Sequence, residues 1–549
     1  MTISASFILG LRENHERAAG GASARVSDLK GHPEAIRRVG IVGGGTAGFL
    51  AALALRARMP HLEITLLESK AIPIIGVGEA TDPHIVPFLH RTCMLDPHDF
   101  YARVRPTWKQ GIRFEWGSPG GGHFHAPFDW DSNNIGLLGS LAGEGDINSM
   151  TLQARLMERR VAPIVDRRGA RVSLLPWIPV AYHLENRRLV RYLTEVAEAR
   201  GIRHLDRTIV DVVAAPEGGA VDHLVTDQGE SLSFDLYLDC TGFRSLLLGK
   251  CLETPFESFA SSLYTDRALT FSVDNGGAPD PYTTATTCEG GWTWTIPHED
   301  RDHHGYVFAS AFTRDDEAER EARRRWPAMG EVSGVVRFRS GRHREAWRGN
   351  VVALGNAFAF VEPLESTGLL AICVAIEKLV ALFPATRSDR AGRALFNAYM
   401  TRQWDALRWF LAIHYKFNQR LDTPFWRAVR ADADVSGAAP LIDAFTELGP
   451  LSLQDDQVLE LLHGSGAPLF YGLHGWDCLL LGQGVPTRMP PSREPPERWE
   501  ARRAEAEALA STGLDHAAAL AWVHAHPELL ADQLDAPDGW VQGLFAATA

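Results

Sequence analysis

Three glycines in the first tenth of the chain have the spacing of a dinucleotide-binding turn. Gly43, Gly45 and Gly48 form GxGxxG directly after the apolar run VGIV, and they open a helical pattern. Glu68 ends the next apolar run, 20 residues after Gly48. Such a turn lets backbone amides approach a pyrophosphate at a helix N-terminus, and a carboxylate at that distance can bind a ribose hydroxyl. The pattern predicts a dinucleotide site, without choosing between FAD and NAD.

Two later apolar runs also end in glycine turns, DLYLDCTGFRS at 235–245 and GNVVALG at 349–355. Strands of this kind close on the cofactor in a doubly wound FAD domain, although each alone could be ordinary core. We find no second strand-linked GxGxxG, and we interpret the glycine-rich run at 136–145 as a loop. If FAD occupies the one fingerprint, reducing equivalents must come from outside the chain.

The elements that would position these residues follow an α/β pattern. Strand and helix patterns alternate from Arg37 to about Pro384, with a helix predicted at Leu189–Arg200 and a strand pair around Val210–Val225. From about Ser388 the pattern becomes mainly helical, and a Pro-rich break, VPTRMPPSREPP, precedes a helical tail. We predict three parts: a mobile extension at 1–36, an FAD-binding module at 37–387 and a mainly helical C-terminal module at 388–549.

Composition fits a soluble enzyme with a large core, since 45% of the 549 residues are hydrophobic and 22% are charged. The formal charge is -13, and arginines alternate with acidic residues, as at 315–325, which disfavours nucleic-acid or anionic-membrane partners. The six cysteines form no CxxC pair and have no histidine at metal spacing, so we expect neither a disulfide framework nor a metal. No apolar run suits a signal core or a membrane span, and we expect a cytoplasmic monomer or homodimer.

Seven motifs follow one another along the chain. They are GGGTAG at 43–48, IGVGEAT at 75–81, WKQGIRFEWG at 108–117, DCTGFRS at 239–245, GWTWTIP at 291–297, FVEPLESTG at 360–368 and NQRLDTPFW at 418–426. In this order they resemble the motifs of the tryptophan-halogenase family of flavin-dependent halogenases, from residue 39 to about 426. GWxWxIP together with EPLESTG on one flavin fold is highly specific. The resemblance implies an FAD-binding doubly wound, Rossmann-like fold of the flavin monooxygenase type with a helical substrate module.

The resemblance implies a lysine and a glutamate as catalytic residues, Lys109 and Glu365. The Lys109 ammonium could donate a hydrogen bond to hypohalous acid, or, if desolvation lowers its pKa, the amine could take the halogen as a haloamine. Glu365 would orient the hypohalous acid or accept the proton lost from the ring. Thr367 and Gly368 would hold the halide, and Ser366 either bridges the catalytic pair or simply forms a turn.

The implied reaction is chlorination or bromination of an electron-rich aromatic such as an indole or phenol. It uses O2, halide and reduced FAD delivered by a separate NAD(P)H-dependent flavin reductase. The interpretation assigns FAD contacts to Gly43, Gly45, Thr46, Ala47, Gly48, Glu68, Gly76, Val77, Gly78, Glu79, Ala80 and Gly355.

Aromatic residues would shape the substrate side of the site. Trp292 and Trp294 are two apart, so a strand places both on one face. Their type alone favours core packing, whereas the family implies that they keep substrate away from the flavin. His125 and Phe128 would sandwich the substrate ring, but the segment HFHAPF at 123–128 matches the family only with a one-residue gap, which weakens free tryptophan as the substrate.

Two other functions remain open at this point. One is a flavin monooxygenase that hydroxylates its aromatic substrate directly, and the other is a non-catalytic flavin-binding protein. Product mass and halide dependence distinguish them from a halogenase.

Overall fold

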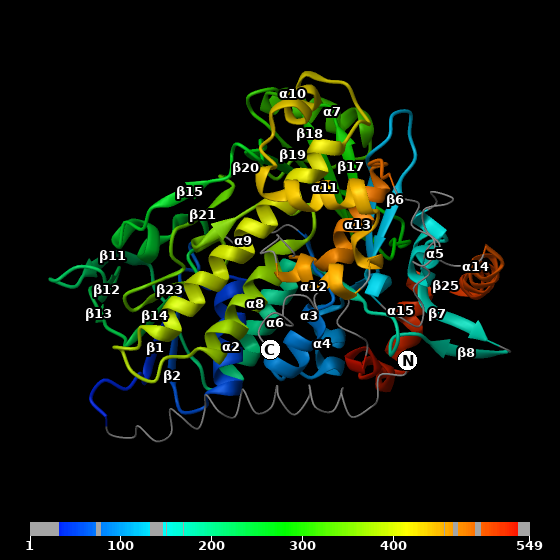
Figure 1. Ribbon diagram of the computed structural model, residues 1–549. Coiled ribbons are helices and arrows are strands. Elements are labelled where there is room, and N and C mark those ends of the chain that lie inside the picture. Colours follow the sequence, from blue (N-terminus) through cyan, green and yellow to red (C-terminus); the bar gives the residue numbers. More distant parts are fainter. Residues whose placement is uncertain are drawn as a thin grey trace.

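The computed structural model describes residues 32–72, 78–131, 147–149, 151–167, 169–454, 456–464, 470–488 and 496–535. A mainly parallel sheet lies at one side of the molecule, and a second, larger sheet lies at the other (Figure 1). The α/β architecture predicted from the sequence is confirmed. Within the described residues, no helix has the length and apolar character needed to cross a bilayer.

The first sheet is the dinucleotide-binding unit. Apolar β1 lies between β2 and β14, so that Val42 pairs with both Leu67 and Asp239 at the carboxyl ends of the strands. All neighbours in this sheet are parallel except the last pair, β23 and β22. The strand order is β10 (Arg203–Asp206), β2 (Glu63–Glu68), β1 (Arg38–Val42), β14 (Leu236–Asp239), β23 (Val351–Ala353) and β22 (Trp347–Arg348).

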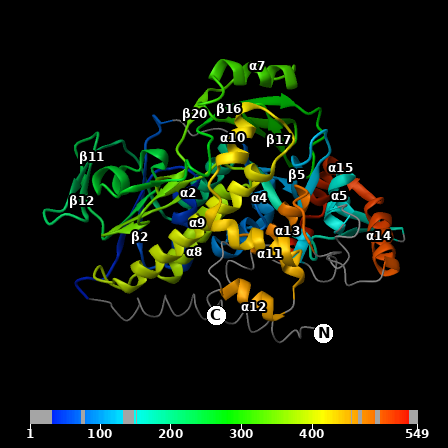
Figure 2. The same cartoon turned by 45° about the horizontal axis from the view of Figure 1, so that its top comes forward.

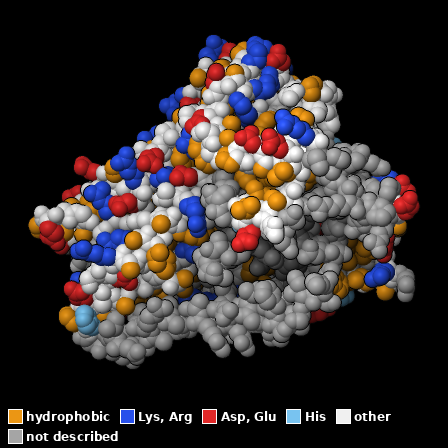
Figure 3. Space-filling model, in the orientation of Figure 1, with side chains coloured by type: hydrophobic (Ala, Val, Ile, Leu, Met, Phe, Trp, Pro, Cys, Tyr) orange, Lys and Arg blue, Asp and Glu red, His pale blue; other side chains and the backbone are white. Residues whose placement is uncertain are grey.

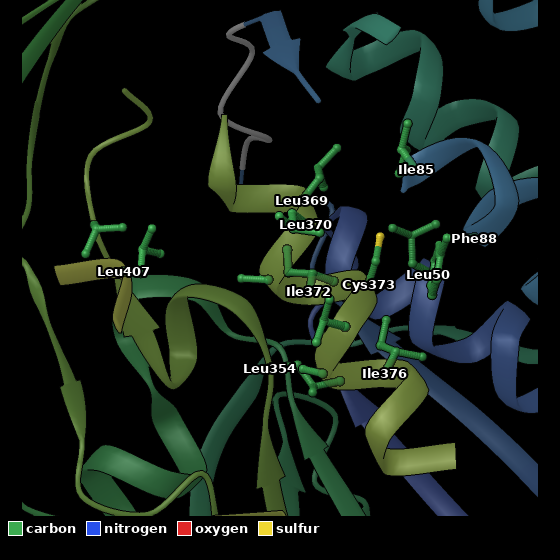
Figure 4. Close-up of a cluster of buried hydrophobic side chains, with 14 of the residues drawn as sticks. Leu50, Ile85, Phe88, Leu354, Leu369, Leu370, Ile372, Cys373, Ile376 and Leu407 are labelled. Carbon is green, nitrogen blue, oxygen red and sulfur yellow. The ribbon is translucent and has the colours of Figure 1, made fainter. Parts of the chain in front are cut away.

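Three helices pack together beside this sheet: α2 (Thr46–Arg58), α6 (Asn186–Ala199) and α8 (Thr367–Ala381). Small residues along α2 (TAGFLAALALRAR) allow close approach, and Figure 4 shows Leu50 of α2 beside Cys373 of α8 in a buried apolar cluster. The predicted helix at 189–200 is confirmed within α6, and Gly201 follows it with φ +70°. Burial of this face fixes the N-termini of α2 and α8 relative to each other.

The second sheet has seven strands and carries α7 (Asp315–Arg325) on one face (Figure 2). Its neighbours are antiparallel except for β17 and β5, which run parallel. The strand order is β20 (Val335–Arg337), β16 (Arg267–Asp274), β19 (Arg301–Phe308), β18 (Gly291–Pro297), β17 (Thr283–Cys288), β5 (Gly111–Glu115) and β6 (Phe124–Pro127).

A small sheet joins the two large ones. Its central strand, β9 (Ala181–Glu185), pairs on one side with β3 (Gly78–Ala80) and on the other with β4 (Thr107–Lys109). The motif WKQGIRFEWG at 108–117 is therefore divided between two sheets. The break falls at Gln110, whose backbone N–H donates to the Pro281 carbonyl at 2.8 Å.

Smaller strand groups complete the sheets. The strand pair predicted around 210–225 is confirmed as β11 and β12. The remaining three-stranded groups are β11 (Ile209–Ala214), β12 (Val221–Thr226) and β13 (Ser231–Leu232); β15 (Phe256–Ser258), β21 (Gly341–His343) and β24 (Ala359–Phe360); and β25 (Gly513–Asp515), β7 (Val161–Arg167) and β8 (Ala170–Ser173).

The C-terminal part is mainly helical, as predicted, and the long α9 crosses the molecule beside α8 (Figure 1). The tail expected to be helical also contains β25, which pairs with β7, and α14 packs on α5 (Leu152–Glu158). The division of the chain at residue 387 stays a prediction. The helices of this part are α9 (Ala391–Phe417), α10 (Pro424–Asp432), α11 (Ala439–Leu448), α12 (Asp456–Gly464), α13 (Gly472–Gly482), α14 (Pro496–Ala510) and α15 (His516–Ala525).

Three of the segments predicted from the sequence lie wholly or mostly outside the described residues. Residues 1–31 of the expected extension, the glycine-rich run at 136–145 and most of the Pro-rich break at 485–496 lie outside the described residues. Ala35 and Ile36 are buried, and Ala35 forms a bridge with Thr386. On the face in Figure 3, basic and acidic side chains are interspersed over the described surface, as the sequence predicts.

Candidate functional site

The turn between β1 and α2 has the shape that a pyrophosphate needs. Gly43 has φ +120°, and a Cβ there would lie 2.2 Å from the Cys240 carbonyl oxygen. A Cβ at Gly48 would lie 1.9 Å from the Gly43 oxygen, whereas one at Gly45 would meet nothing within 4 Å. Two glycines are therefore needed for packing, and the third leaves the backbone open to a ligand at the helix N-terminus. The turn fits FAD.

Side chains around this turn also match a nucleotide site. The Glu68 carboxylate ends β2 against the turn, and its Oε1 lies 3.0 Å from His204 Nε2. Gly355, at φ +59°, brings its backbone beside Ala47 at the start of α2. Thr46 is turned toward the protein, where its hydroxyl donates to Asn186 Oδ1 at 3.0 Å. Glu68, Ala47 and Gly355 thus surround the N-terminus of α2, while the Thr46 side chain binds α6.

The expected flavin strap is described from Gly78, since Gly76 and Val77 lie outside the described residues. Gly78, Glu79 and Ala80 form β3. A Cβ at Gly78 would lie 2.7 Å from His298 Nε2, so the strap runs close to the residue that follows β18. Burial raises the pKa of Glu79 to about 7. The strap thus connects the nucleotide unit to the lysine strand through β9.

Lys109 is fully buried at the end of β4 and has two hydrogen-bond acceptors. Its Nζ donates to the Thr81 carbonyl oxygen at 2.8 Å and to Ser366 Oγ at 2.7 Å. Burial lowers the pKa of Lys109 to about 7, although the nearby carboxylates of Asp82 and Glu365 act in the opposite direction. A lysine in this state exchanges between ammonium and amine near neutral pH.

Glu365 lies next to Ser366 and is held by two aromatic side chains. Its Oε1 lies 2.6 Å from His414 Nε2 on α9, and its carbonyl oxygen accepts from the Tyr471 hydroxyl at 3.0 Å. His414 Nδ1 lies 2.9 Å from the Phe410 carbonyl oxygen. Because a carbonyl only accepts, Nδ1 carries a hydrogen, and Nε2 is the atom that faces Glu365 Oε1.

The start of α8 forms an open, polar corner beside this pair. Ser366 precedes the helix with φ +59°, an uncommon conformation for a residue with a side chain. Thr367 is buried, and its Oγ1 has no hydrogen-bond partner among the described residues. A Cβ added to Gly368 would meet nothing within 4 Å. A helix N-terminus with an unsatisfied hydroxyl and free space suits a small anion.

The two tryptophans of GWTWTIP lie in β18, as a strand with alternating faces predicts. Trp292 and Trp294 are buried with ring centroids 6.0 Å apart, and Trp294 lies over Gly305 of β19. Within the described part of the chain, Trp294 Nε1 has no hydrogen-bond partner. The two tryptophans therefore contribute apolar rings, and no titratable group, to the second sheet.

The two residues expected to sandwich a substrate ring have different surroundings. The Phe128 ring centroid lies 5.3 Å from Lys109 Nζ. The His125 imidazole instead contacts Glu158 Oε2 at 2.8 Å, and its ring centroid is 5.7 Å from that of Tyr282. Only Phe128 therefore adjoins the lysine. Other rings that surround the Glu365–His414 pair are Phe114, Phe124 and Phe410.

Several residues of the site were not singled out from the sequence. Thr81 contributes its backbone oxygen, a contact that the residue type does not predict. His414 and Tyr471 lie on apolar segments that pattern alone assigns to core. Asp82 follows the strap motif directly and is buried, and burial raises its pKa to about 6. A polar residue inside an apolar helix, as at His414, was the one available signal.

A Rossmann-like FAD cradle joined by a short sheet to a buried lysine–glutamate pair defines a flavin-dependent halogenase. The family model described as tryptophan halogenase matches residues 38–495. The chain belongs to this family and is an enzyme of that class.

Named relatives and solved structures agree with this assignment. The 7-chloro-L-tryptophan 6-halogenase KtzR of Kutzneria sp. (strain 744) is 34% identical over 487 residues, which is 82% of this chain and 91% of KtzR. The tryptophan 7-halogenase RebH of Lentzea aerocolonigenes is 31% identical over 487 residues, 83% of this chain and 91% of RebH. The crystal structure of MibH, described as a lathipeptide tryptophan 5-halogenase, has a TM-score of 0.88 and 53% identity, covering 94% of this chain and 99% of MibH.

Proposed function

We propose that this chain uses reduced FAD, O2 and halide to halogenate an indole ring, with Lys109 and Glu365 as its catalytic residues. The observation that carries the proposal is the fully buried Lys109, which burial gives a pKa of about 7. Its Nζ donates a hydrogen bond to Ser366, the residue next to Glu365. Such a lysine is costly to bury and has a use only if its ammonium or amine takes part in chemistry. The Glu365–His414 pair supplies a proton acceptor beside it.

The cofactor would be held by the β1–α2 turn, Glu68, the strap and Gly355. When bound and reduced, FAD supplies the electrons with which O2 is activated, so that halide is oxidised to hypohalous acid. Gly43, Gly45 and Gly48 bind the pyrophosphate through backbone amides. Because the sequence has one strand-linked fingerprint, we assign the reduction of FAD to a separate NAD(P)H-dependent flavin reductase.

The halide would bind at the start of α8. The N–H groups of the first helical turn and the unsatisfied Thr367 hydroxyl provide donors, and the backbone at Gly368 leaves room for the ion. Trp292 and Trp294 are buried in the second sheet, and their rings carry no carboxyl or amine group that could exchange a proton. They exclude water and bulky substrate from the side of the site that the strap also closes.

Lys109 would then direct the halogen to the substrate ring. As an ammonium it donates a hydrogen bond that makes the halogen of hypohalous acid more electrophilic; as an amine it takes the halogen and transfers it. Phe128 lies next to Nζ and offers a face against which an indole can stack. Glu365, with His414, accepts the proton that the ring loses after attack.

We infer that the indole belongs to a tryptophan residue within a peptide. The support is the likeness to MibH, which at 53% identity is well above the identity to KtzR, whose name specifies a free amino acid. The departure at HFHAPF and the position of His125 against Glu158 also differ from a histidine–phenylalanine clamp for free tryptophan.

Mass spectrometry of a complete reaction tests the proposal. The protein is incubated with FAD, a flavin reductase, NADH, O2 and either chloride or bromide, with free tryptophan, tryptophan-containing peptides, simple indoles and phenols. We expect a halide-dependent mass increase on peptide tryptophan, which Lys109→Ala removes and Lys378→Ala retains. Lys378 is a matched control because it is another partly buried lysine, packed over Tyr399.

Other results would contradict parts of the proposal. Hydroxylated product without halide would identify a monooxygenase. Equal product from Lys109→Ala and the unchanged protein would remove Lys109 from the mechanism. Preference for free tryptophan over every peptide would overturn the substrate assignment alone, and no product from any substrate with FAD bound would contradict the halogenase function.

A further inference from the structure

Two histidines and a glutamate meet at one point on the edge of the second sheet, away from Lys109. His123 lies just before β6 and His125 lies within it, so the extended chain turns both imidazoles to the same side. Glu158 is the last residue of α5, which packs beside β6 (Figure 1). Its Oε2 lies 2.7 Å from His123 Nε2 and 2.8 Å from His125 Nε2.

One donor atom from each of these three side chains therefore converges on the same point. The three candidate ligand atoms all lie within 4.8 Å of one another. Neutral imidazole and carboxylate are the forms that bind metals. These donor types converge on one point and therefore suit a metal ion.

The two glutamate–histidine distances approach the donor spacing of a zinc site. Zn–N and Zn–O bonds of about 2.0–2.2 Å place the donors of a tetrahedral ion about 3.3 Å apart. The present N···O distances of 2.7 and 2.8 Å are those of hydrogen bonds, so Glu158 must withdraw by about half an ångström. It has the freedom to do so, because its side chain is 37% exposed at a helix end.

The backbone that carries the two histidines is fixed by a separate residue. Asn148 Oδ1 accepts from the His125 backbone N–H at 2.8 Å, and Asn148 Nδ2 donates to the His123 carbonyl oxygen at 3.1 Å. β6 is also paired with β5, with Arg113 opposite His125. Ligands held by such supporting bonds are positioned before an ion arrives, which lowers the entropy lost on binding.

We propose that His123, His125 and Glu158 form a zinc-binding site that joins β6 to α5. His125 is fully buried, whereas His123 is 19% exposed, so an ion enters from the solvent side and keeps a water as its fourth ligand. β6 leads directly to Phe128, the ring beside Lys109. The ion would therefore fix the strand that presents the substrate-side ring, without taking part in redox chemistry.

This site was not expected from the sequence. The cysteines predicted no metal site, and the segment at 123–128 predicted only substrate stacking. Glu158 follows 33 residues after His125, and only the packing of α5 on β6 brings it to the histidines.

Metal analysis and a zinc titration test the site directly, without the halogenase reaction. An untagged chain is stripped with a chelator, dialysed and titrated with Zn²⁺ in competition with a chromophoric chelator. We expect one Zn²⁺ per chain and a thermal midpoint that rises on zinc addition. Co²⁺ should give the visible absorption bands of a tetrahedral site. Loss of one ligand should weaken zinc binding by more than the about 10- to 100-fold that loss of a supporting residue costs.

Matched variants decide between this site and binding elsewhere. His123→Ala and Glu158→Gln should lose both the tight binding and the rise in thermal midpoint; the second nearly preserves the shape of the side chain. His223→Ala is the control, since His223 also contacts a carboxylate, Asp222, at 2.8 Å but has no second histidine in that contact. The proposal is overturned if the unchanged protein binds no stoichiometric zinc, or if both ligand variants keep its affinity while retaining FAD binding and native circular dichroism.

Discussion

The FAD cradle and the lysine site are built in opposite ways. The cradle consists mainly of backbone from six consecutive residues, Gly43 to Gly48. It requires glycine at Gly43 and Gly48, where a side chain would clash with backbone. The lysine site consists of side chains and two backbone carbonyls from five separate elements: β4, the end of the strap, the start of α8, α9 and the segment before α13. The cradle is therefore sensitive to added volume, whereas the lysine site is sensitive to lost charge and lost hydrogen bonds.

Lys109→Ala gives the largest expected effect and separates the two regions. Loss of a positioned acid or base typically costs about 10² to 10⁴-fold in rate. We expect that loss in kcat for halogenation, with FAD affinity unchanged, because the hydrogen-bond partners of Lys109, Thr81 and Ser366, lie outside the β1–α2 turn. Stopped-flow turnover and flavin-fluorescence titration measure the two quantities. A parallel loss of FAD binding would show that the regions are not independent.

Gly48→Ala should have the reverse effect. The added Cβ would lie 1.9 Å from the Gly43 oxygen, so the turn must move. Overpacking of this kind costs about 1–3 kcal/mol, or roughly 5- to 150-fold in the FAD Kd. At saturating FAD, kcat should recover. Gly330→Ala is the control, since its Cβ would make only an ordinary 3.7 Å contact; an unchanged Kd for Gly48→Ala would contradict the packing argument.

The pH profile sharpens the description of the lysine site. With a pKa of about 7, Lys109 loses its proton as pH rises through neutrality. Turnover should fall over that range if the ammonium activates hypohalous acid, and it should rise if the amine carries the halogen. Asp82→Asn removes an anion that raises the Lys109 pKa, so the midpoint should move to lower pH by about one pH unit by either route. A midpoint that stays in place would exclude Lys109 as the titrating group.

Tyr471→Phe should give the smallest change. It removes one hydroxyl donor to the Glu365 carbonyl oxygen, and a hydrogen bond of this kind is worth about 1 kcal/mol, or roughly fivefold in kcat. Tyr306→Phe is the control because Tyr306 is equally buried but donates to Glu321, outside the site. It should lower thermal stability without lowering turnover. A Tyr471→Phe loss as large as that of Lys109→Ala would make Tyr471 a direct participant in the reaction.

The same contrast explains what the sequence could predict. The cradle is local, so the spacing of Gly43, Gly45 and Gly48 predicted its strand, turn and helix. Lys109 and Glu365 were recognised through their motifs, but their partners could not be. His414 lies 49 residues from Glu365, and the oxygen of Thr81 belongs to the backbone. Such contacts depend on helix packing and strand register, which no local pattern specifies.

The pairing of β9 with both β3 and β4 limits how this enzyme can be redesigned. His183 is opposite Ala80 on one side and Thr107 on the other, so a single strand sets the register of strap and lysine together. One inserted residue in β9 would reverse the faces of the β9 residues that follow it and shift β3 and β4 relative to each other, which would disturb the position of Lys109. New substrate specificity should therefore be sought in exposed segments outside this small sheet, where insertions leave the distance between flavin and lysine unaltered.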